Sequence, residues 1–482
     1  MIKSKTYYYL FILIILLHTV FHFISYEGNN LRLNLDSISY LKYAKVVHEG
    51  SLRSPQLKRT PVYPILLNTF YSISGESPAW LLALITFQHL LVISIVLLVF
   101  LCAKNMGITS KIIFIGVSIQ LLNYKPICYA NLVMTEVLYM FFILCYVYFL
   151  SNVAYRKTSK KKVISSLIIS GVLLSLATLT RPISQLMYVV GVIAIIVGSA
   201  ERRIITFNRA IIFLVSSLLL IILYMGYNKK TQGSFCITGF KGSNFYFTVV
   251  DDDRIEPPDA HYSNIIRGVT GWDMLVRENR SYMNVEEALA VKGYNVKEID
   301  TIMTNAGLEG VKSHPIRFVY ISAMKIGIYF LKFGGATFRY YVPGQSMPNV
   351  LTVFKKIIKS YTRIELPVSS IPMPLSTDTS DNISSNIHLI LLIILGIFLR
   401  GILSWGYIGI FIFTIFRRLK EYKKYWFILY IHTIIWYHAL LCSAVNEPLS
   451  RYRMVIEPLM VLIIIFELED YGVKNGREGA LI

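Results

Sequence analysis

The feature that most constrains this chain is a series of long apolar segments, because about 18 or more apolar residues in a row can cross a lipid bilayer as a helix. Polar or basic stretches separate these segments. The predicted spans are residues 7–24, 79–103, 111–129, 135–153, 164–180, 183–199, 210–227, 387–416, 425–444 and 454–467. Only 16% of the residues are charged, against about 25% in an average soluble domain, so the chain lacks enough polar surface to cover itself in water. The sequence therefore predicts an all-α polytopic membrane protein with roughly 10 to 12 transmembrane helices.

The basic residues give these spans an orientation. The formal net charge is +20, and the basic residues are concentrated in alternate loops. These basic loops are 104–111, 156–162, 201–209 and 417–424. The positive-inside rule places them in the cytoplasm together with the N-terminus, and their recurrence in alternate loops favours topology over a nucleic-acid partner. No small-residue cleavage site follows the first segment, so we expect it to remain as the first span.

Parity then divides the chain into three regions. Residues 1–227 form an N-terminal transmembrane module, and residues 25–78 are its first external loop. Residues 228–386 form an extracytoplasmic cap region, and residues 387–482 form a C-terminal transmembrane module. The largest loops are therefore predicted to lie outside.

Two segments leave the number of spans open. In residues 316–333, three basic residues share one side of a helical wheel, which favours a helix lying in the membrane interface over a further span. They are Arg317, Lys325 and Lys332. Residues 387–416 are interrupted by Arg400 and Gly401, so they form either one tilted span or a broken pair.

The first external loop carries two residues suited to chemistry. Asp36 begins a predicted short helix that Gly50 ends. The helix dipole keeps such a carboxylate ionised, which suits a base that accepts a hydroxyl proton and suits an ordinary N-cap equally well. Arg59 precedes a turn that contains Pro61 and Pro64, and it can present a fork-shaped cation to a phosphate. Its alternative role is contact with lipid headgroups.

Four more charged residues stand at the outward ends of predicted spans. They are Glu136, Arg181, Arg451 and Arg453. An ionisable group at the edge of an apolar segment is costly unless it is paired or lines a polar cavity, so these residues are site candidates. The alternatives are headgroup anchoring for the arginines and a first-turn helix acid for Glu136.

In this order, the motifs resemble the GT-C superfamily of membrane glycosyltransferases, which use polyprenyl-phosphate sugars and include protein O-mannosyltransferases and the aminoarabinose transferase of lipid A. The resemblance covers residues 1 to about 230 and a short late segment. Its elements are the Asp36 loop, the Arg59-Thr60-Pro61-Val62-Tyr63-Pro64 turn, Thr135-Glu136, Leu179-Thr180-Arg181-Pro182, and Arg451-Tyr452-Arg453 followed by Glu457-Pro458. Residues 228–386 resemble no family.

The resemblance implies a GT-C-like fold with a small external cap. It also implies an inverting glycosyltransferase that moves a sugar from a polyprenyl-phosphate donor, such as undecaprenyl phosphate, to a hydroxyl of an extracytoplasmic acceptor. Asp36 would be the catalytic base and Glu136 a second catalytic acid. The donor phosphate would be bound by Lys58, Arg59, Arg181, Arg451 and Arg453, and the substrate cavity would be lined by Tyr40, Tyr63 and Tyr452.

The expected partners are a lipid-linked sugar donor, a glycan or lipid-linked acceptor such as O antigen or lipopolysaccharide, and membrane lipid. No cofactor or metal is indicated. The five cysteines form no C-x-x-C pair, and the sequence reads Lys58-Arg59-Thr60 where the aminoarabinose transferase has a metal-binding glutamate. We expect a bacterial inner membrane protein with a site that faces the periplasm.

Two other functions fit the same composition. A transporter or flippase for a lipid-linked or small anionic substrate also needs charges within the membrane, but it tends to have short loops and helices broken at the midplane. Arg400 beside Gly401 is such a hint. An O-antigen ligase or polymerase shares the substrate class and differs in its loops. Asp251 to Asp253 contain an Asp-x-Asp, which we interpret as a solvated acidic turn because nucleotide sugars are absent outside the cell.

Overall fold

The computed structural model shows helices throughout the part of the chain that it describes. It describes residues 12, 15, 16, 35–54, 57–74, 79–156, 159–198, 203–239, 241–250, 255, 258–270, 282–331, 387–444 and 450–478. Within these residues, six helices are long and apolar enough to cross a membrane, and three shorter apolar helices accompany them. By length and composition these helices make the chain an integral membrane protein.

The N-terminal module follows the predicted apolar segments closely. Its elements are α2 (Leu35–His48), α3 (Val62–Ser74), α4 (Ala79–Asn105), α5 (Ser110–Leu121), α6 (Tyr124–Ala130), α7 (Glu136–Tyr155), α8 (Lys160–Thr180), the 3-10 turn η2 (Pro182–Ser184), α9 (Met187–Gly198) and α10 (Arg203–Gln232). Helix α8 lies between α7 and α10. Gly171 permits this close packing, because a Cβ there would lie only 2.0 Å from Ser216 Oγ of α10.

The predicted span at residues 111–129 is wrong, because the structure has two separate helices there instead of one. The helix ends at Leu121, and a second helix begins at Tyr124 with Pro126 in its first turn, where proline is tolerated. Asn123 lies in the break and donates a hydrogen bond to Glu457. Hydrophobic periodicity does not reveal this break, because both pieces are apolar.

The C-terminal module contains α17 (Ile387–Lys420), α18 (Tyr422–Ala444), the short α19 (Ser450–Met454) and α20 (Glu457–Glu478). Helix α17 is a single helix of 34 residues, so Arg400 and Gly401 do not interrupt it. Arg400 is buried and donates hydrogen bonds to Glu457 on α20. The broken-helix hint of a transporter therefore has no counterpart here.

The helix ends next to three of the four predicted basic loops, 104–111, 156–162 and 417–424, lie at one end of the bundle. Three contacts join them. Arg156 donates to Asn105 at 2.8 Å, the Thr109 backbone amide donates to Glu469 at 2.9 Å, and Arg417 pairs with Asp470. The helices involved are α4, α5, α7, α17 and α20. This gathering matches the parity of the predicted cytoplasmic loops.

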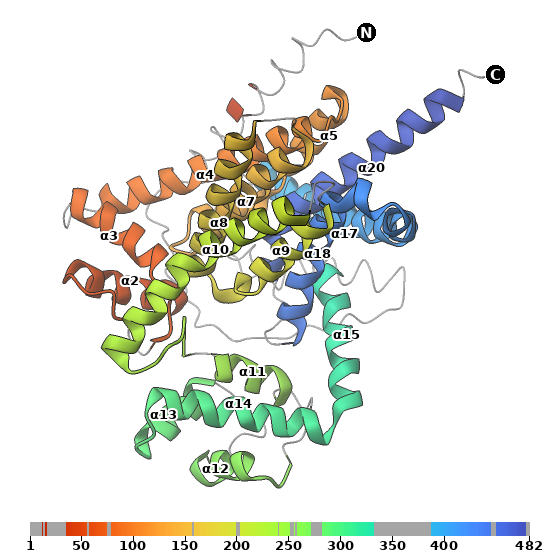
Figure 1. Cartoon of the computed structure of the whole chain (residues 1–482). Coiled ribbons are helices and arrows are strands. Elements are labelled where there is room, and N and C mark those ends of the chain that lie inside the picture. Colours follow the sequence, from red (N-terminus) through yellow and green to blue (C-terminus); the bar gives the residue numbers. More distant parts are fainter. Residues whose placement is uncertain are drawn as a thin grey trace.

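A small helical cap stands at the other end of the bundle (Figure 1). It consists of α11 (Lys241–Val250), α12 (His261–Thr270), α13 (Tyr282–Val291) and α14 (Val296–Ser313) around a hydrophobic core of its own. Gly293, with a φ of +92°, turns the chain between α13 and α14. Asn295 then begins α14 in a capping box with Glu298.

Helix α15 (Pro315–Leu331) connects the cap to the bundle and packs against α18 (Figure 1). Its bounds agree with the segment predicted to lie in the membrane interface, and its depth in a membrane stays a prediction. Lys325 does not reach toward headgroups, because it is buried and donates to the Thr248 carbonyl of α11 at 3.0 Å. This contact holds α15 against the cap.

Several features singled out in the sequence lie outside the described residues. They are most of the first predicted span, Asp251 to Asp253, Lys332, and residues 332–386 of the cap region.

Candidate active site

Asp36 lies at the centre of an ion cluster at the cap end of the bundle. It stands in the first turn of α2. One of its carboxylate oxygens accepts a hydrogen bond from Arg59 Nη2 at 2.5 Å, and the other accepts one from Arg451 Nη1 at 2.8 Å. The two arginines are 392 positions apart in the sequence by their residue numbers, 59 and 451. The fold therefore brings the first external loop and the short helix α19 together on one carboxylate.

Arg59 is held in place by the loop that carries it. Its backbone amide donates to Ser54 Oγ at 3.1 Å, and its Nε donates to Ser39 Oγ at 2.7 Å. The guanidinium lies over the ring of Tyr40, with its central carbon 4.6 Å from the ring centroid. Such a guanidinium is fixed in orientation before any ligand arrives.

Glu136 and Arg181 form the second pair of the cluster. Glu136 begins α7, Arg181 ends α8, and their charged atoms lie 2.7 Å apart. Arg451 Nε is 4.0 Å from the same carboxylate, so Arg451 joins the two pairs. The ring of Tyr452 lies under both guanidiniums, 4.9 Å from Arg181 and 5.2 Å from Arg451.

The cluster contains buried polar atoms that make no hydrogen bond within the described residues. They are both carboxylate oxygens of Glu136, Arg181 Nη1 and Arg451 Nε. The charges face one another, but their geometry does not suit directed hydrogen bonds. Arg181 Nη1 and Glu136 Oε1 are nevertheless ion-paired at 2.7 Å, and Arg451 Nε lies 4.0 Å from the same oxygen, so these charges compensate one another without an aligned hydrogen bond. Such atoms at one place mark a site that a polar ligand would complete.

The cluster carries a positive excess. Three guanidiniums, those of Arg59, Arg181 and Arg451, face two carboxylates, those of Asp36 and Glu136, which leaves a formal charge of +1. The side chains of Arg59, Asp36 and Arg451 are 23–27% exposed, so the cluster is reachable from outside. An anion can therefore enter it.

Burial alone would raise the pKa of the Asp36 carboxyl. The guanidiniums of Arg451 and Arg59 outweigh this effect and hold the pKa well below its usual range. Asp36 is therefore a carboxylate at neutral and mildly acidic pH. In this state each of its two oxygens accepts a hydrogen bond from an arginine. The carboxylate is therefore a weak base until another anion binds those arginines.

A second layer of hydrogen bonds positions the cluster. Gln88 of α4 accepts from Tyr63 at 3.1 Å and donates to the carbonyls of Ala130 and Leu132, in the turn that leads to Glu136. Thr60 donates to the carbonyl of Thr180 at 2.8 Å, which ties the Arg59 loop to the end of α8. Gln88 was missed in the sequence because a lone polar residue within an apolar span gives no local signal.

The structure places the three predicted cavity tyrosines around the cluster. Tyr40 and Tyr63 pack edge to face, with ring centroids 5.3 Å apart, and Tyr452 lies beneath the arginines. All three side chains are buried. They form an aromatic lining rather than a set of exposed hydroxyls.

Two of the residues expected to bind the donor phosphate lie elsewhere. Lys58 pairs with Glu286 of the cap at 2.8 Å, and Ser243 of α11 donates to the same carboxylate. Arg453 is fully buried and pairs with Glu457, and its Nη1 donates to the carbonyls of Tyr329 and Phe330. Arg451 and Arg453 are two positions apart on a helix, which turns their side chains by about 200°, so only Arg451 faces Asp36.

Among the described residues, no group of three or more His, Cys, Asp or Glu side chains is arranged to hold a metal ion.

The comparisons with known proteins concern the fold. No protein-family model and no curated protein match the sequence. The structure is similar to the apo oligosaccharyltransferase of Archaeoglobus fulgidus, with 9% identity, a TM-score of 0.44 and coverage of 99% of this chain. It is also similar to ArnT from Cupriavidus metallidurans, with 11% identity over 96% of this chain and 77% of that one, at a TM-score of 0.38. A second ArnT structure, bound to undecaprenyl phosphate, matches at a TM-score of 0.37.

All of these TM-scores lie below 0.5 and all of these identities below 12%, so the similarities are distant. The chain spans about half the length of the archaeal oligosaccharyltransferase, 52% of it. A likeness this distant concerns the arrangement of helices alone, and the chemistry of the site has to come from its own side chains.

Proposed function

We propose that the protein is an inverting glycosyltransferase that takes a sugar from a polyprenyl-phosphate donor and adds it to an acceptor hydroxyl outside the cytoplasm. The observation that carries this proposal is the cluster of three arginines on two carboxylates, with buried polar atoms that lack hydrogen bonds and a net positive charge. Such a cluster suits one phosphate group that is flanked by a hydroxyl-rich ligand.

The phosphate of the donor would take over the arginines. Arg181 Nη1 and Arg451 Nε face Glu136 as ion pairs without a hydrogen bond among the described residues, so these two arginines are the first to engage the phosphate oxygens. Guanidinium groups bind phosphate through paired hydrogen bonds, and here they are already oriented by Tyr452. As Arg451 turns from Asp36 to the phosphate, the carboxylate gains a free oxygen and its pKa rises.

Asp36 would then act as the base. The acceptor oxygen attacks the anomeric carbon and transfers its proton to Asp36. The bond between the anomeric carbon and the phosphate oxygen breaks, and its electron pair leaves with the phosphate. The arginines stabilise the charge that develops on this leaving group. Because attack and departure occur on opposite faces of the sugar, a single displacement inverts the anomeric configuration.

Glu136 would bind the sugar. Both of its oxygens are buried without a hydrogen bond among the described residues, and a carboxylate in that state accepts readily from sugar hydroxyls. Its neighbour Arg181 pairs with it at 2.7 Å beside the proposed phosphate site. This role differs from that of Asp36, which is reachable from outside.

The lipid-linked donor fits the location of the cluster at the ends of apolar helices. Glu136 and Arg181 stand at the termini of α7 and α8, so a lipid tail can stay in the bilayer while its phosphate reaches the arginines. We propose undecaprenyl phosphate as the lipid, a bacterial inner membrane with a periplasmic site as the location, and a surface polysaccharide such as O antigen or lipopolysaccharide as the acceptor.

The experiment is an assay with purified protein in lipid nanodiscs. Each of a panel of undecaprenyl-phosphate sugars is incubated with the protein and a set of glycan acceptors, and the release of free undecaprenyl phosphate is measured. We expect release that depends on both the protein and one of the donors. A cooperative thermal unfolding transition shows that the purified protein is folded. If such protein consumes none of the donors, the proposal is wrong.

A further inference from the structure

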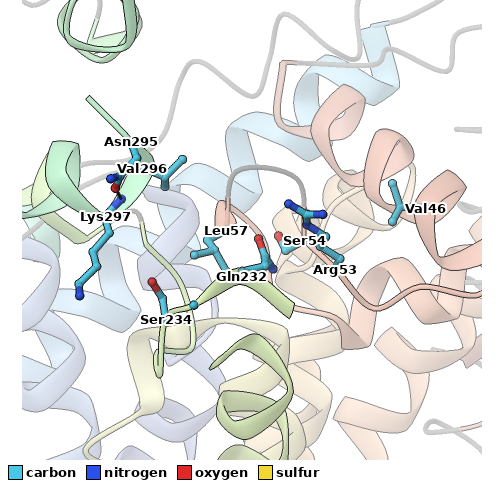
Figure 2. A pocket seen from close by; sticks show the side chains of 10 residues that line it. Val46, Arg53, Ser54, Leu57, Gln232, Ser234, Asn295, Val296 and Lys297 are labelled. Carbon is cyan, nitrogen blue, oxygen red and sulfur yellow. Dashed lines mark hydrogen bonds between the residues drawn. The ribbon is translucent and has the colours of Figure 1, made fainter. Parts of the chain in front are cut away.

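A groove runs between the first external loop and the cap (Figure 2). Its volume is about 720 Å³, within the 300–1,000 Å³ that is typical of ligand sites. It is lined by α2, the loop that follows it, the end of α10 and the start of α14. The described lining residues are Val46, Arg53, Ser54, Leu57, Gln232, Gly233, Ser234, Asn295, Val296 and Lys297.

The charges of this groove have one sign. Arg53 lies on the first-loop side and Lys297 on the cap side, as Figure 2 shows. Both side chains are exposed, and none of the ten described lining residues is acidic. Two cations on opposite sides of a groove favour a ligand with negative charge distributed along its length.

The floor of the groove offers hydrogen bonds. Gln232 Nε2 is a buried donor that makes no hydrogen bond within the described residues. Ser234 adds a hydroxyl group. A ligand rich in oxygen acceptors would satisfy these groups, whereas an apolar ligand would leave the Gln232 amide unpaired.

The groove adjoins the residues that position Arg59. Ser54, on its wall, accepts a hydrogen bond from the Arg59 backbone amide at 3.1 Å. The Leu57 carbonyl accepts from the Gly239 amide at 3.0 Å, which joins the loop to the segment that leads into the cap. Lys58, on the same loop, pairs with Glu286 of the cap. These contacts hold the two sides of the groove together beside the Asp36 cluster.

We propose that this groove binds an acidic saccharide and so selects the acceptor of the glycosyl transfer, an inference that rests on the function proposed above. Arg53 and Lys297 pair with carboxylate or phosphate groups of the glycan, and Gln232 with Ser234 binds its hydroxyls. The acceptor then extends from the groove past Arg59 toward Asp36. The acceptor class is an anionic polysaccharide rather than a neutral one.

The test compares a charged and a neutral form of the same sugar chain. Binding of trigalacturonate and of its methyl ester to the full-length protein in nanodiscs is measured by calorimetry, with no donor present. We expect the acid to bind more tightly than the ester. The double variant Arg53→Gln/Lys297→Gln should lose about tenfold in affinity for the acid and little for the ester, as expected for two partly exposed ion pairs.

Matched controls remove nearby charges that do not line the groove. Lys42 of α2 and Lys292 of the cap are both exposed, and Lys42→Gln/Lys292→Gln changes the net charge equally. This control should keep the wild-type affinity for the acid. Equal affinity of the wild type for acid and ester, or an equal loss in the control variant, overturns the inference.

Two further outcomes separate this inference from the proposed function. If the acid binds as expected but no lipid-linked donor is consumed, acidic-saccharide binding by the groove is supported and the transferase proposal fails. If transfer occurs but Arg53→Gln/Lys297→Gln leaves the KM for an acidic acceptor unchanged, the groove proposal alone fails. A double variant that loses affinity for dihexanoyl phosphatidylglycerol, and not for trigalacturonate, would identify a headgroup site and also overturn it.

Discussion

Two ion clusters built from the same residue types lie at the two sides of α19, and they differ in access. In the first, Arg451 joins Asp36, Arg59, Glu136 and Arg181, and the Asp36 side chain is 27% exposed. In the second, Arg453 and Arg400 enclose Glu457, and all three side chains are at most 1% exposed.

The carboxylates show the same contrast. Both oxygens of Glu457 accept hydrogen bonds, one from Arg400 and Arg453 and the other from Asn123. Both oxygens of Glu136 lack hydrogen bonds among the described residues. A carboxylate whose oxygens are all hydrogen-bonded, such as Glu457, holds helices together. A carboxylate that is ion-paired but makes no hydrogen bond among the described residues, such as Glu136, can still accept hydrogen bonds from a ligand. Two arginines only two positions apart therefore serve different purposes, which the following predictions test.

The largest expected effect is on turnover. Asp36→Asn removes the proposed base and should lower kcat by about 10²–10⁴ in protein that is still folded at the assay temperature, as measured by thermal unfolding. Turnover is measured by release of undecaprenyl phosphate. Glu49→Gln, at an exposed acid of the same loop, is the control and should retain full activity. Normal turnover in Asp36→Asn would remove Asp36 as the base.

The next effect is on stability, in the closed cluster. Glu457→Gln leaves Arg400 and Arg453 buried without a counter-charge, and breaking such a pair typically costs about 3–5 kcal/mol. We expect a marked fall in unfolding temperature in detergent. Glu469→Gln is the matched control. Glu469 lies on the same helix as Glu457, is partly exposed and accepts a hydrogen bond from Thr109, so this substitution should cost much less. Equal stability losses for both variants would contradict the contrast between the clusters.

The third prediction concerns the arginines of the open cluster. Arg181→Gln or Arg451→Gln each removes a donor to the developing phosphate charge and should lower kcat by about 10²–10³. Arg451→Lys should recover only part of this loss, since lysine lacks the fork-shaped pair of donors. The measurement is single-turnover transfer with saturating donor. An arginine variant that changes only the acceptor KM would assign that residue to the acceptor instead.

A smaller effect is expected at the link between loop and cap. Lys58→Gln breaks a partly exposed pair with Glu286, worth about 1 kcal/mol or less. We expect the acceptor KM to rise a few-fold with unchanged donor consumption at saturating acceptor. A double-mutant cycle with Glu286→Gln measures the coupling. A loss of kcat as large as that of Arg451→Gln would indicate that Lys58 binds the donor phosphate after all.

The smallest effect is on pH dependence. A group whose pKa is depressed in the folded protein stays ionised until the pH falls through that low value, so the contribution of the Asp36 carboxylate is lost only at strongly acidic pH. Between about pH 7 and about pH 5, kcat/KM, which reports the free enzyme, should therefore stay level. An acid limb in this range that disappears in Asp36→Asn would show that the arginines do not hold its pKa down.

The sequence alone predicted most of the apolar helices that the structure describes, because hydrophobic length is a local signal. The side of the membrane on which each loop lies stays a prediction from loop charge. It also singled out Asp36, Arg59, Glu136, Arg181 and Arg451, which the fold brings together. Their roles in catalysis and phosphate binding remain predictions.

The sequence did not separate Arg451 from Arg453 or place Lys58, because the direction of a side chain on a short helix or loop depends on packing partners far away in the sequence. For the same reason Gln88 and Glu286 gave no signal. Gln88 is one amide within an apolar span, and Glu286 lies in a cap region whose sequence resembles no known family. Only the folded arrangement shows what each of them contacts.

The most direct test is the affinity of the protein for undecaprenyl phosphate alone, with no sugar and no reaction. If the open cluster is the phosphate site, Arg451→Gln should bind this lipid at least about tenfold more weakly than the wild type. Asp36→Asn should bind it as tightly or more tightly, because it removes a carboxylate that competes for the same guanidiniums. Wild-type affinity in Arg451→Gln, together with weaker binding in Asp36→Asn, would contradict the account.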